Sequence, residues 1–188
     1  QAARRAHTVV SRSATTIGQV VHDFAENYGK HKIDPESNPA PKLPVNPDAL
    51  RGARGFLAWV DNHHVIFKYM ERVLYSEKYE LVGRCDLIAK VDGDLVVADY
   101  KTSSGVYPEM FLQLAGYQAM LNEELIYAAK RQRITGRLIL RFDKDTGDFE
   151  AKRLFDDSQD RHFSAVLAAK TLARVMRGVK LEINAGEE

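Results

Sequence analysis

Cysteine is nearly absent from this chain of 188 residues, in which Cys85 is the single example. One thiol cannot build an intrachain disulfide, a four-cysteine zinc site or a cysteine-ligated iron–sulfur cluster, so no such cluster is expected. The chain also lacks an apolar run near the ~18 residues of a membrane span, and no segment resembles a signal peptide. We therefore expect no membrane partner and a reducing, cytoplasmic setting.

An excess of one charge is missing as well, because 27 Lys and Arg stand against 26 Asp and Glu for a net charge of +1. Without a global positive field, a nucleic-acid partner would have to be held by a local basic surface. The composition is that of an ordinary globular protein, and we predict one domain over residues 1–188. The chain begins with Gln1 rather than Met, which leaves open that an N-terminal part is missing.

Proline is rare outside residues 34–48, which hold five of the six prolines and are predicted to be an irregular surface crossing. Hydrophobic periodicity predicts helices at about 15–29 and 47–70, on either side of it. Further predicted elements are strands at 73–81, 82–91 and 94–101, a helix at 108–131, strands at 136–142 and 149–154, and a helix at 158–177. This order predicts a mixed α/β (α+β) fold with helices flanking a small central sheet.

The strongest turn signal is Asp92-Gly93, which is typical of a type I′ hairpin turn that pairs Val91 with Asp94. If this register continues, Asp86 lies opposite Asp99. Side chains alternate between the two faces of a strand, so both carboxylates are expected on one face of the sheet.

Two carboxylates at such close range destabilise a sheet unless something compensates for their charge. They would share a proton or bind a cation, and hard oxygen ligands suit Mg²⁺ or Mn²⁺. The alternative is that the strand ends reach solvent, where Arg84 and Lys101 form ordinary ion pairs with the aspartates.

Four short motifs follow one another along these elements. They are Gly18-Gln19-Val20-Val21-His22, Gly83-Arg84-Cys85-Asp86, Asp99-Tyr100-Lys101 and Gln113-Leu114-Ala115-Gly116-Tyr117. In order and setting they resemble the PD-(D/E)XK nuclease superfamily, and most of all its RecB-like branch, which includes many phage and mitochondrial exonucleases. The resemblance covers residues 18–117 and implies the restriction-endonuclease-like core of that superfamily.

The resemblance also implies a role for each matched residue. The metal ligands would be His22, Asp86, Asp99 and the backbone carbonyl of Tyr100, holding one or two Mg²⁺ or Mn²⁺ ions. Lys101 would orient the attacking water or stabilise charge on the scissile phosphate. Gln113 and Tyr117 would position the catalytic site or contact the substrate, and Arg84 would bind the substrate.

The implied function is a divalent-metal-dependent DNA nuclease that hydrolyses phosphodiester bonds. The leading hypothesis is an exonuclease of DNA recombination, repair or phage replication, in the cytoplasm of a bacterium or a phage-infected cell. An endonuclease on the same fold and a non-catalytic DNA-binding or assembly module remain alternatives. DNA is the expected partner, and a homo-oligomer or a larger recombination complex stays open, as do cleavage polarity and strand preference.

The remaining signals have simpler interpretations. His22 alone would be an ordinary histidine, and Glu26 and Glu71 are interpreted as surface charge unless they lie beside the metal ligands. Two basic groups could follow phosphates or form solvated faces: Lys130, Arg131, Arg133, Arg137 and Arg141, and Lys170, Arg174 and Arg177. Asp143, Asp145 and Asp148 lack the spacing of a calcium loop and predict a hairpin turn. Tyr107 could stack on a base or pack in the core.

Overall fold

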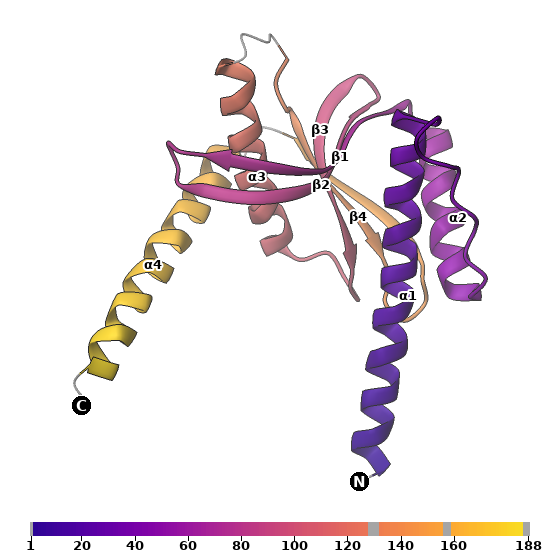
Figure 1. Ribbon diagram of the computed structural model, residues 1–188, viewed down its shortest axis with the longest axis horizontal. Coiled ribbons are helices and arrows are strands. Elements are labelled where there is room, and N and C mark those ends of the chain that lie inside the picture. Colours follow the sequence, from indigo (N-terminus) through magenta and orange to yellow (C-terminus); the bar gives the residue numbers. More distant parts are fainter. Residues whose placement is uncertain (1, 128–131, 156–158, 186–188) are drawn as a thin grey trace.

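A computed structural model describes residues 2–127, 132–155 and 159–185. Its elements are, in chain order, α1 (Ala2–Ile33), α2 (Pro47–Asn62), β1 (Val65–Ser76), β2 (Leu81–Val91), β3 (Asp94–Thr102), α3 (Pro108–Tyr127), β4 (Gly136–Phe142), β5 (Phe149–Phe155) and α4 (Gln159–Ala185). This is the predicted mixed α/β order, with one sheet between two helical layers (Figure 1).

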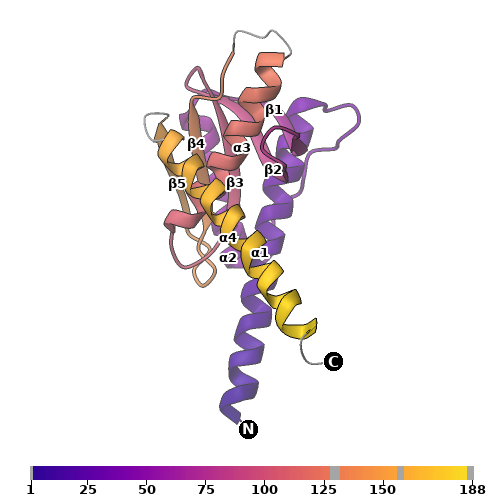
Figure 2. The same ribbon diagram turned by 90° about the vertical axis from the view of Figure 1, so that its left-hand side faces the viewer.

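The five strands lie in the order β1-β2-β3-β4-β5. Neighbours are antiparallel except β3 and β4, which run parallel and are connected through α3. One face of the sheet packs against α1 and α2, around Phe56, Leu87 and Leu140. The other face packs against α3, around Leu114 and Ile139. Figure 2 shows α4 outside α3 on this second side.

Local sequence explains where the helices start and which way they face. Asn46 caps α2, because its side chain accepts hydrogen bonds from the backbone N–H groups of Asp48 and Ala49, and Pro47 fills the first helical turn. In α1, Val21 and Phe24 are buried on the side toward the sheet. The proline-rich crossing between the two helices is irregular over residues 34–46, as predicted.

The hairpin turn between β2 and β3 is confirmed. Asp92 and Gly93 both have positive φ, 52° and 95°, as a type I′ turn requires. The strands pair in the predicted register from Val91–Asp94 to Leu87–Ala98. The regular ladder ends there, one step before the predicted pair of aspartates.

The region around residue 65 differs from the prediction. The helix predicted to reach residue 70 ends at Asn62, and 65–70 belong to β1. This run of β-branched and aromatic residues satisfies its backbone by pairing with β2, starting at Val65–Val91. The strand predicted at 73–81 ends at Ser76, since Glu80 has a positive φ of 47° in the turn to β2.

The outer helices also differ in length. α1 begins at Ala2 rather than near residue 15, and α4 extends to Ala185 rather than ending near 177. Residues 128–131 of the predicted third helix and residue 158 of the last lie outside the described residues. No helix in the described ranges is both long and apolar enough to cross a membrane.

Candidate active site

Strands β2 and β3 separate at Asp86 and Asp99, and the separation creates the candidate site. Where the ladder would continue, the Asp86 carboxylate accepts a hydrogen bond from the backbone N–H of Tyr100 at 2.8 Å. The Tyr100 ring is buried and packs edge-on against the His22 ring of α1, with the ring centroids 5.3 Å apart. Asp86 is thus held between the two strands and close to α1.

The strict alternation of faces, on which the predicted carboxylate pair depended, is broken at this level of β2. Cys85 and Ile88 pack toward α3, whereas Leu87 packs toward α1. Asp86 therefore turns toward His22. In β3 the alternation persists, with Val97 packing toward α3 and Lys101 reaching a residue of α3. The regular pairing that was expected to place Asp86 directly opposite Asp99 is absent here, although the two carboxylates remain electrostatic neighbours.

Three side chains of metal-ligating type converge on the α1 side of this break. His22, Glu71 and Asp86 each offer one ligand atom, and these atoms lie within 4.8 Å of one another. His22 Nε2 is 3.7 Å from Asp86 Oδ2. We refer to these three residues as the acidic cluster. It contains two of the ligands predicted from the resemblance, while Asp99 lies outside it.

Glu71 is the residue that the sequence interpretation missed as a core member of this site. It has a positive φ of 50°, and the register places it level with Asp86, between the Met70–Leu87 and Arg72–Cys85 pairs. The predicted helix and strand left residue 71 outside both elements, so its pairing with β2 could not be inferred. Glu26, 3.9 Å from His22 Nδ1, also lies beside the cluster.

The electrostatics of the acidic cluster favour a cation. Asp86, and less strongly Glu26 and Glu71, raise the pKa of His22 against the opposing effect of burial. Burial, followed by the charges of Glu26 and Asp86, raises the pKa of Glu71. His22 Nδ1 is buried with no hydrogen-bond partner among the described residues. An imidazole and two carboxylates that repel one another therefore fit a divalent ion.

The other predicted residues form a chain of polar contacts from β3 to α3. Lys101 Nζ lies 2.5 Å from Asp99 Oδ2 and donates a hydrogen bond to Gln113 Oε1 at 2.8 Å. Gln113 Nε2 donates in turn to the Tyr117 hydroxyl at 2.8 Å. Gln113 and Tyr117 lie one helical turn apart, so one face of α3 fixes the Lys101 ammonium beside Asp99.

Asp99 is almost completely buried, with 3% of its surface exposed. Burial, and next the charge of Asp86, raises its pKa to about 6, although Lys101 pulls in the opposite direction. Asp99 therefore takes up a proton more readily than an ordinary aspartate does.

This raised pKa predicts that the metal-free protein loses stability as the pH rises from about 4 to about 6. The folded state binds the Asp99 proton more tightly than the unfolded chain, where the pKa is about 3.9. The stabilisation is complete below pH 4, is lost above pH 6 and amounts to about 2–3 kcal/mol. Thermal unfolding of wild type and Asp99→Asn in EDTA, at a series of pH values, measures this stabilisation. A difference in stability between wild type and Asp99→Asn that does not change with pH contradicts the prediction.

Two glycines of the motifs let these elements approach one another. A Cβ at Gly83 would lie 2.5 Å from Cε1 of Tyr117, and a Cβ at Gly18 would lie 2.3 Å from Cγ2 of Thr102. The first contact seats the Tyr117 ring on β2, and the second brings α1 against β3 next to Lys101. The motifs are therefore coupled by packing.

Substitution Gly83→Ala is expected to destabilise the protein by about 1–3 kcal/mol, because the methyl group displaces the ring of Tyr117. Thermal unfolding measures this loss. Gly178→Ala in α4 is the matched control, since no atom of the described residues would lie within 4 Å of the added methyl group, and alanine there stabilises the helix by about 0.5–1 kcal/mol. Equal melting temperatures for Gly83→Ala and wild type would show that the ring has room to move.

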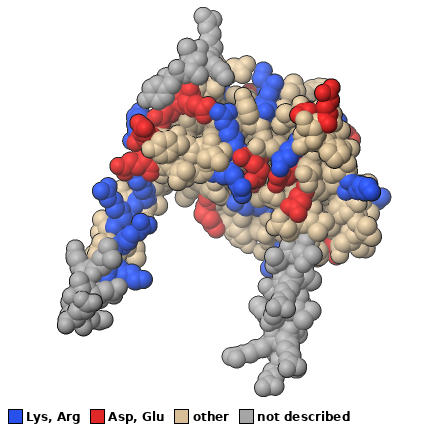
Figure 3. Space-filling model, in the orientation of Figure 1, with Lys and Arg blue, Asp and Glu red and all other residues tan. Residues whose placement is uncertain are grey.

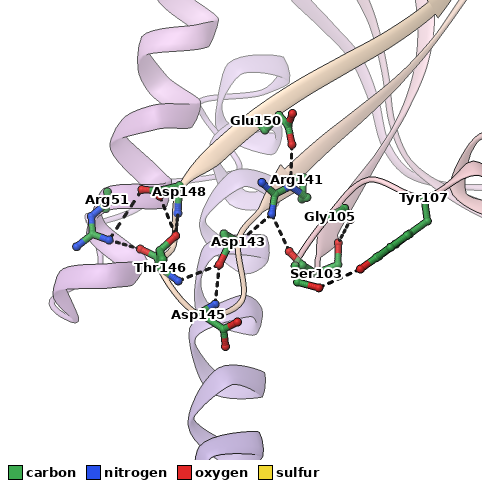
Figure 4. Close-up of polar contacts among 11 residues, drawn as sticks. Arg51, Ser103, Gly105, Tyr107, Arg141, Asp143, Asp145, Thr146, Asp148 and Glu150 are labelled. Atoms are coloured by element: carbon green, nitrogen blue, oxygen red, sulfur yellow. Dashed lines mark hydrogen bonds and ion pairs between the residues drawn. The ribbon is translucent and has the colours of Figure 1, made fainter.

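Arg141, one of the predicted basic group, is engaged by contacts within the fold. Its guanidinium binds Asp143 at 2.8 Å and Glu150 at 2.9 Å, and donates to the carbonyl of Ser103 at 2.9 Å (Figure 4). Arg137 is completely buried. Arg133 is exposed, whereas Lys130 and Arg131 lie outside the described residues. Arg137 and Arg141 therefore stabilise the fold, and the described arginines of this group do not form one surface cluster.

Two further predictions concern the turn at residues 143–148 and the side chain of Tyr107. The β4–β5 connection is a hairpin turn, in which Asp143 Oδ1 accepts from the backbone N–H groups of Asp145 and Thr146 (Figure 4). Tyr107 is 42% exposed and its hydroxyl lies 3.0 Å from that of Ser104, so it is not a core residue.

Arg84 projects from β2 at the edge of the acidic cluster. Its Nε lies 2.8 Å from Glu71 Oε2, and the side chain is largely exposed. The alternative prediction was that the strand ends reach solvent, where Arg84 and Lys101 pair with the two aspartates. Lys101 does form an ion pair with Asp99, but Asp99 is buried. Acidic and basic side chains gather near one another where α1 leaves the body of the molecule (Figure 3).

The fold is that of a known nuclease class. The model of the PD-(D/E)XK nuclease superfamily matches residues 2–188, so the chain belongs to this superfamily. Nucleases of the superfamily act with divalent metals. No curated protein matches the sequence at a significant level.

A solved structure from Eubacterium rectale, described as a "Putative exonuclease", has a similar fold, with a TM-score of 0.52 and 12% sequence identity. The similarity covers 86% of this chain and 66% of that protein, slightly less than two thirds of its length. At this identity the similarity concerns the fold.

Proposed function

We propose that this protein is a divalent-metal-dependent DNA nuclease, and that it acts as an exonuclease in recombination, repair or phage replication. The observation that carries the proposal is that Asp86 of the acidic cluster is an electrostatic neighbour of Asp99, which forms an ion pair with Lys101. Negative side chains and a fixed ammonium group thus flank one place where a phosphodiester could lie. We further propose that residues 1–188 act as a single nuclease domain.

His22, Glu71 and Asp86 would hold the metal, with Asp99 and the Tyr100 carbonyl as the further ligands that the family resemblance implies. A bound Mg²⁺ or Mn²⁺ supplies Lewis-acid activation of water and neutralises phosphate charge. Glu71 enters this set on the geometry of the cluster.

The remaining residues act on the substrate and the water. The Lys101 ammonium, held by Gln113, would stabilise the charge that develops on the scissile phosphate. Tyr117 keeps Gln113 in place through its hydroxyl, so it acts as a positioning residue. Arg84 would bind a phosphate next to the cluster.

The test is incubation of the purified protein with end-labelled linear DNA and closed circular DNA, in Mg²⁺, Mn²⁺ or EDTA. An exonuclease degrades the linear DNA to short products and spares the circle, and EDTA abolishes the activity. Cuts within the circle would instead identify an endonuclease. Binding of DNA that is indifferent to EDTA, without products in any metal, would identify a non-catalytic module and overturn the proposal.

A further inference from the structure

Beyond the acidic cluster, β1 and β2 continue as a two-stranded arm over residues 72–85 (Figure 1). The register pairs Val73 with Arg84 and Tyr75 with Val82. These four side chains are 69%, 65%, 66% and 74% exposed, in that order. They lie at every second position from Glu71 and Asp86, so they continue the face of the acidic cluster. We call them the arm face.

The opposite face of the arm is covered, and its tip is fixed. Leu74 and Cys85 are buried against α3. At the tip, the Tyr79 ring packs edge-on against Phe163 of α4, with the centroids 4.8 Å apart. Lys170 of α4 donates to the Tyr79 carbonyl at 2.7 Å. A two-stranded hairpin is marginally stable alone, so these contacts make the arm a supported platform with one open side.

The arm face combines three exposed large apolar side chains with one cation. Adjacent exposed apolar groups of this size usually mark a binding surface. Alternate residues of a strand are about 6.5 Å apart, which places Arg84 about 6.5 Å and Tyr75 about 13 Å along the arm from the level of the acidic cluster. The order from the cluster is therefore cation first and aromatic ring second.

We propose that the arm face binds a single strand of nucleic acid and guides it to the acidic cluster. A base stacks on the ring of Tyr75 against Val82, and a backbone phosphate contacts Arg84. A guanidinium for the backbone and an aromatic ring for a base are the two elements of surfaces that bind single strands. The inference rests on the proposed function, because it places a phosphate further along that strand at the cluster.

A single strand fits this face better than a duplex. Stacking on Tyr75 requires a base whose flat face is open, and the bases inside a duplex already stack on one another. A stacked strand rises about 3.4 Å along its axis per nucleotide, so Tyr75 is about four nucleotides from the cluster. A short substrate held at the cluster would end before it reaches the ring.

The test is binding of a fluorescent 12-nucleotide oligo-dT in EDTA, measured by anisotropy for wild type, Tyr75→Ala and Tyr75→Phe. Tyr75→Ala is expected to weaken binding by about 5- to 150-fold, the usual contribution of one stacked base, whereas Tyr75→Phe retains the ring and the affinity. In Mg²⁺ or Mn²⁺, the effect of Tyr75→Ala on kcat/KM should grow from a trinucleotide to the 12-mer.

A matched pair of valines controls for general loss of exposed apolar surface. Val82→Thr on the arm face should weaken binding, whereas Val45→Thr, at a position 96% exposed before α2, should leave binding and activity unchanged. Val82→Thr also serves if Tyr75→Ala does not fold, which circular dichroism would reveal.

The inference is overturned if wild type does not bind the oligonucleotide, if Tyr75→Ala binds equally well, or if blunt duplex shows the same Tyr75 dependence. Self-association of wild type that Tyr75→Ala abolishes, without an effect on oligonucleotide binding, would assign the face to a second copy and overturn it as well. Failure of the proposed function gives a different result, which is intact Tyr75-dependent binding without products in any metal.

Discussion

Substitution Asp86→Asn is expected to reduce DNA hydrolysis by at least about 10³-fold while the fold remains intact. Asp86 belongs to the acidic cluster, and its carboxylate also accepts the Tyr100 N–H. Asparagine keeps an oxygen that can accept this bond but removes the charge that binds a cation. Several kcal/mol of transition-state stabilisation depend on that charge, and each 1.36 kcal/mol corresponds to a factor of ten in rate.

Initial rates on end-labelled DNA in Mn²⁺, together with thermal unfolding, measure both parts of this expectation. Wild type should melt at a higher temperature in Mn²⁺ than in EDTA, since a ligand bound only to the folded state stabilises it. Asp86→Asn should lose this increase. Asp94→Asn is the matched control, because Asp94 lies at the other end of β3 and pairs with Arg153. Hydrolysis by Asp86→Asn within tenfold of wild type would remove Asp86 from the site.

The β2–β3 hairpin was predictable because its determinants are local. Two consecutive residues with positive φ are costly for most sequences, and Asp-Gly is among the few pairs that adopt them easily. Once Val91 is paired with Asp94, the register of the next pairs follows without further information. The same local logic placed Gln113 and Tyr117 one turn apart on α3.

The position of Glu71 was not predictable in this way. Its place beside Asp86 depends on the pairing of β1 with β2. The hydrophobic periodicity had assigned the first part of β1 to a helix. It depends further on the positive φ at Glu71 and on the break in alternation between Cys85 and Leu87. Neither irregularity has a marker such as glycine at residue 71 or 86, since both are set by tertiary packing.

The resemblance to the nuclease superfamily succeeded because its motifs include the residues that allow the elements to meet. Gly18 permits α1 to approach Thr102, and Gly83 permits Tyr117 to lie on β2. The motifs thus contain both the glycines that let the helices approach the strands and the polar side chains that this approach brings together. Residues that only complete the cluster, such as Glu71, lie outside the motifs and need the structure.

Substitution Lys101→Met is expected to reduce hydrolysis by about 10²–10³-fold, the usual loss when one donor to a developing charge is removed. A second effect separates this role from a structural one. Lys101 lowers the pKa of Asp99, so without the ammonium group this pKa rises above its value of about 6. If ionised Asp99 is required, the acid limb of the pH–rate profile moves to higher pH by about one unit.

The measurement is kcat/KM from pH 5 to pH 9 for wild type, Lys101→Met and Lys90→Met, in which the control lysine lies near the β2–β3 turn. Lys90→Met should retain the rate and the acid limb of wild type. Lys101→Arg restores a cation, so it should return the acid limb toward wild type even where the rate stays low, because a guanidinium is bulkier than an ammonium. An acid limb that is identical in wild type and Lys101→Met would separate Lys101 from the ionisation of Asp99. Lys101 would then act only on the phosphate.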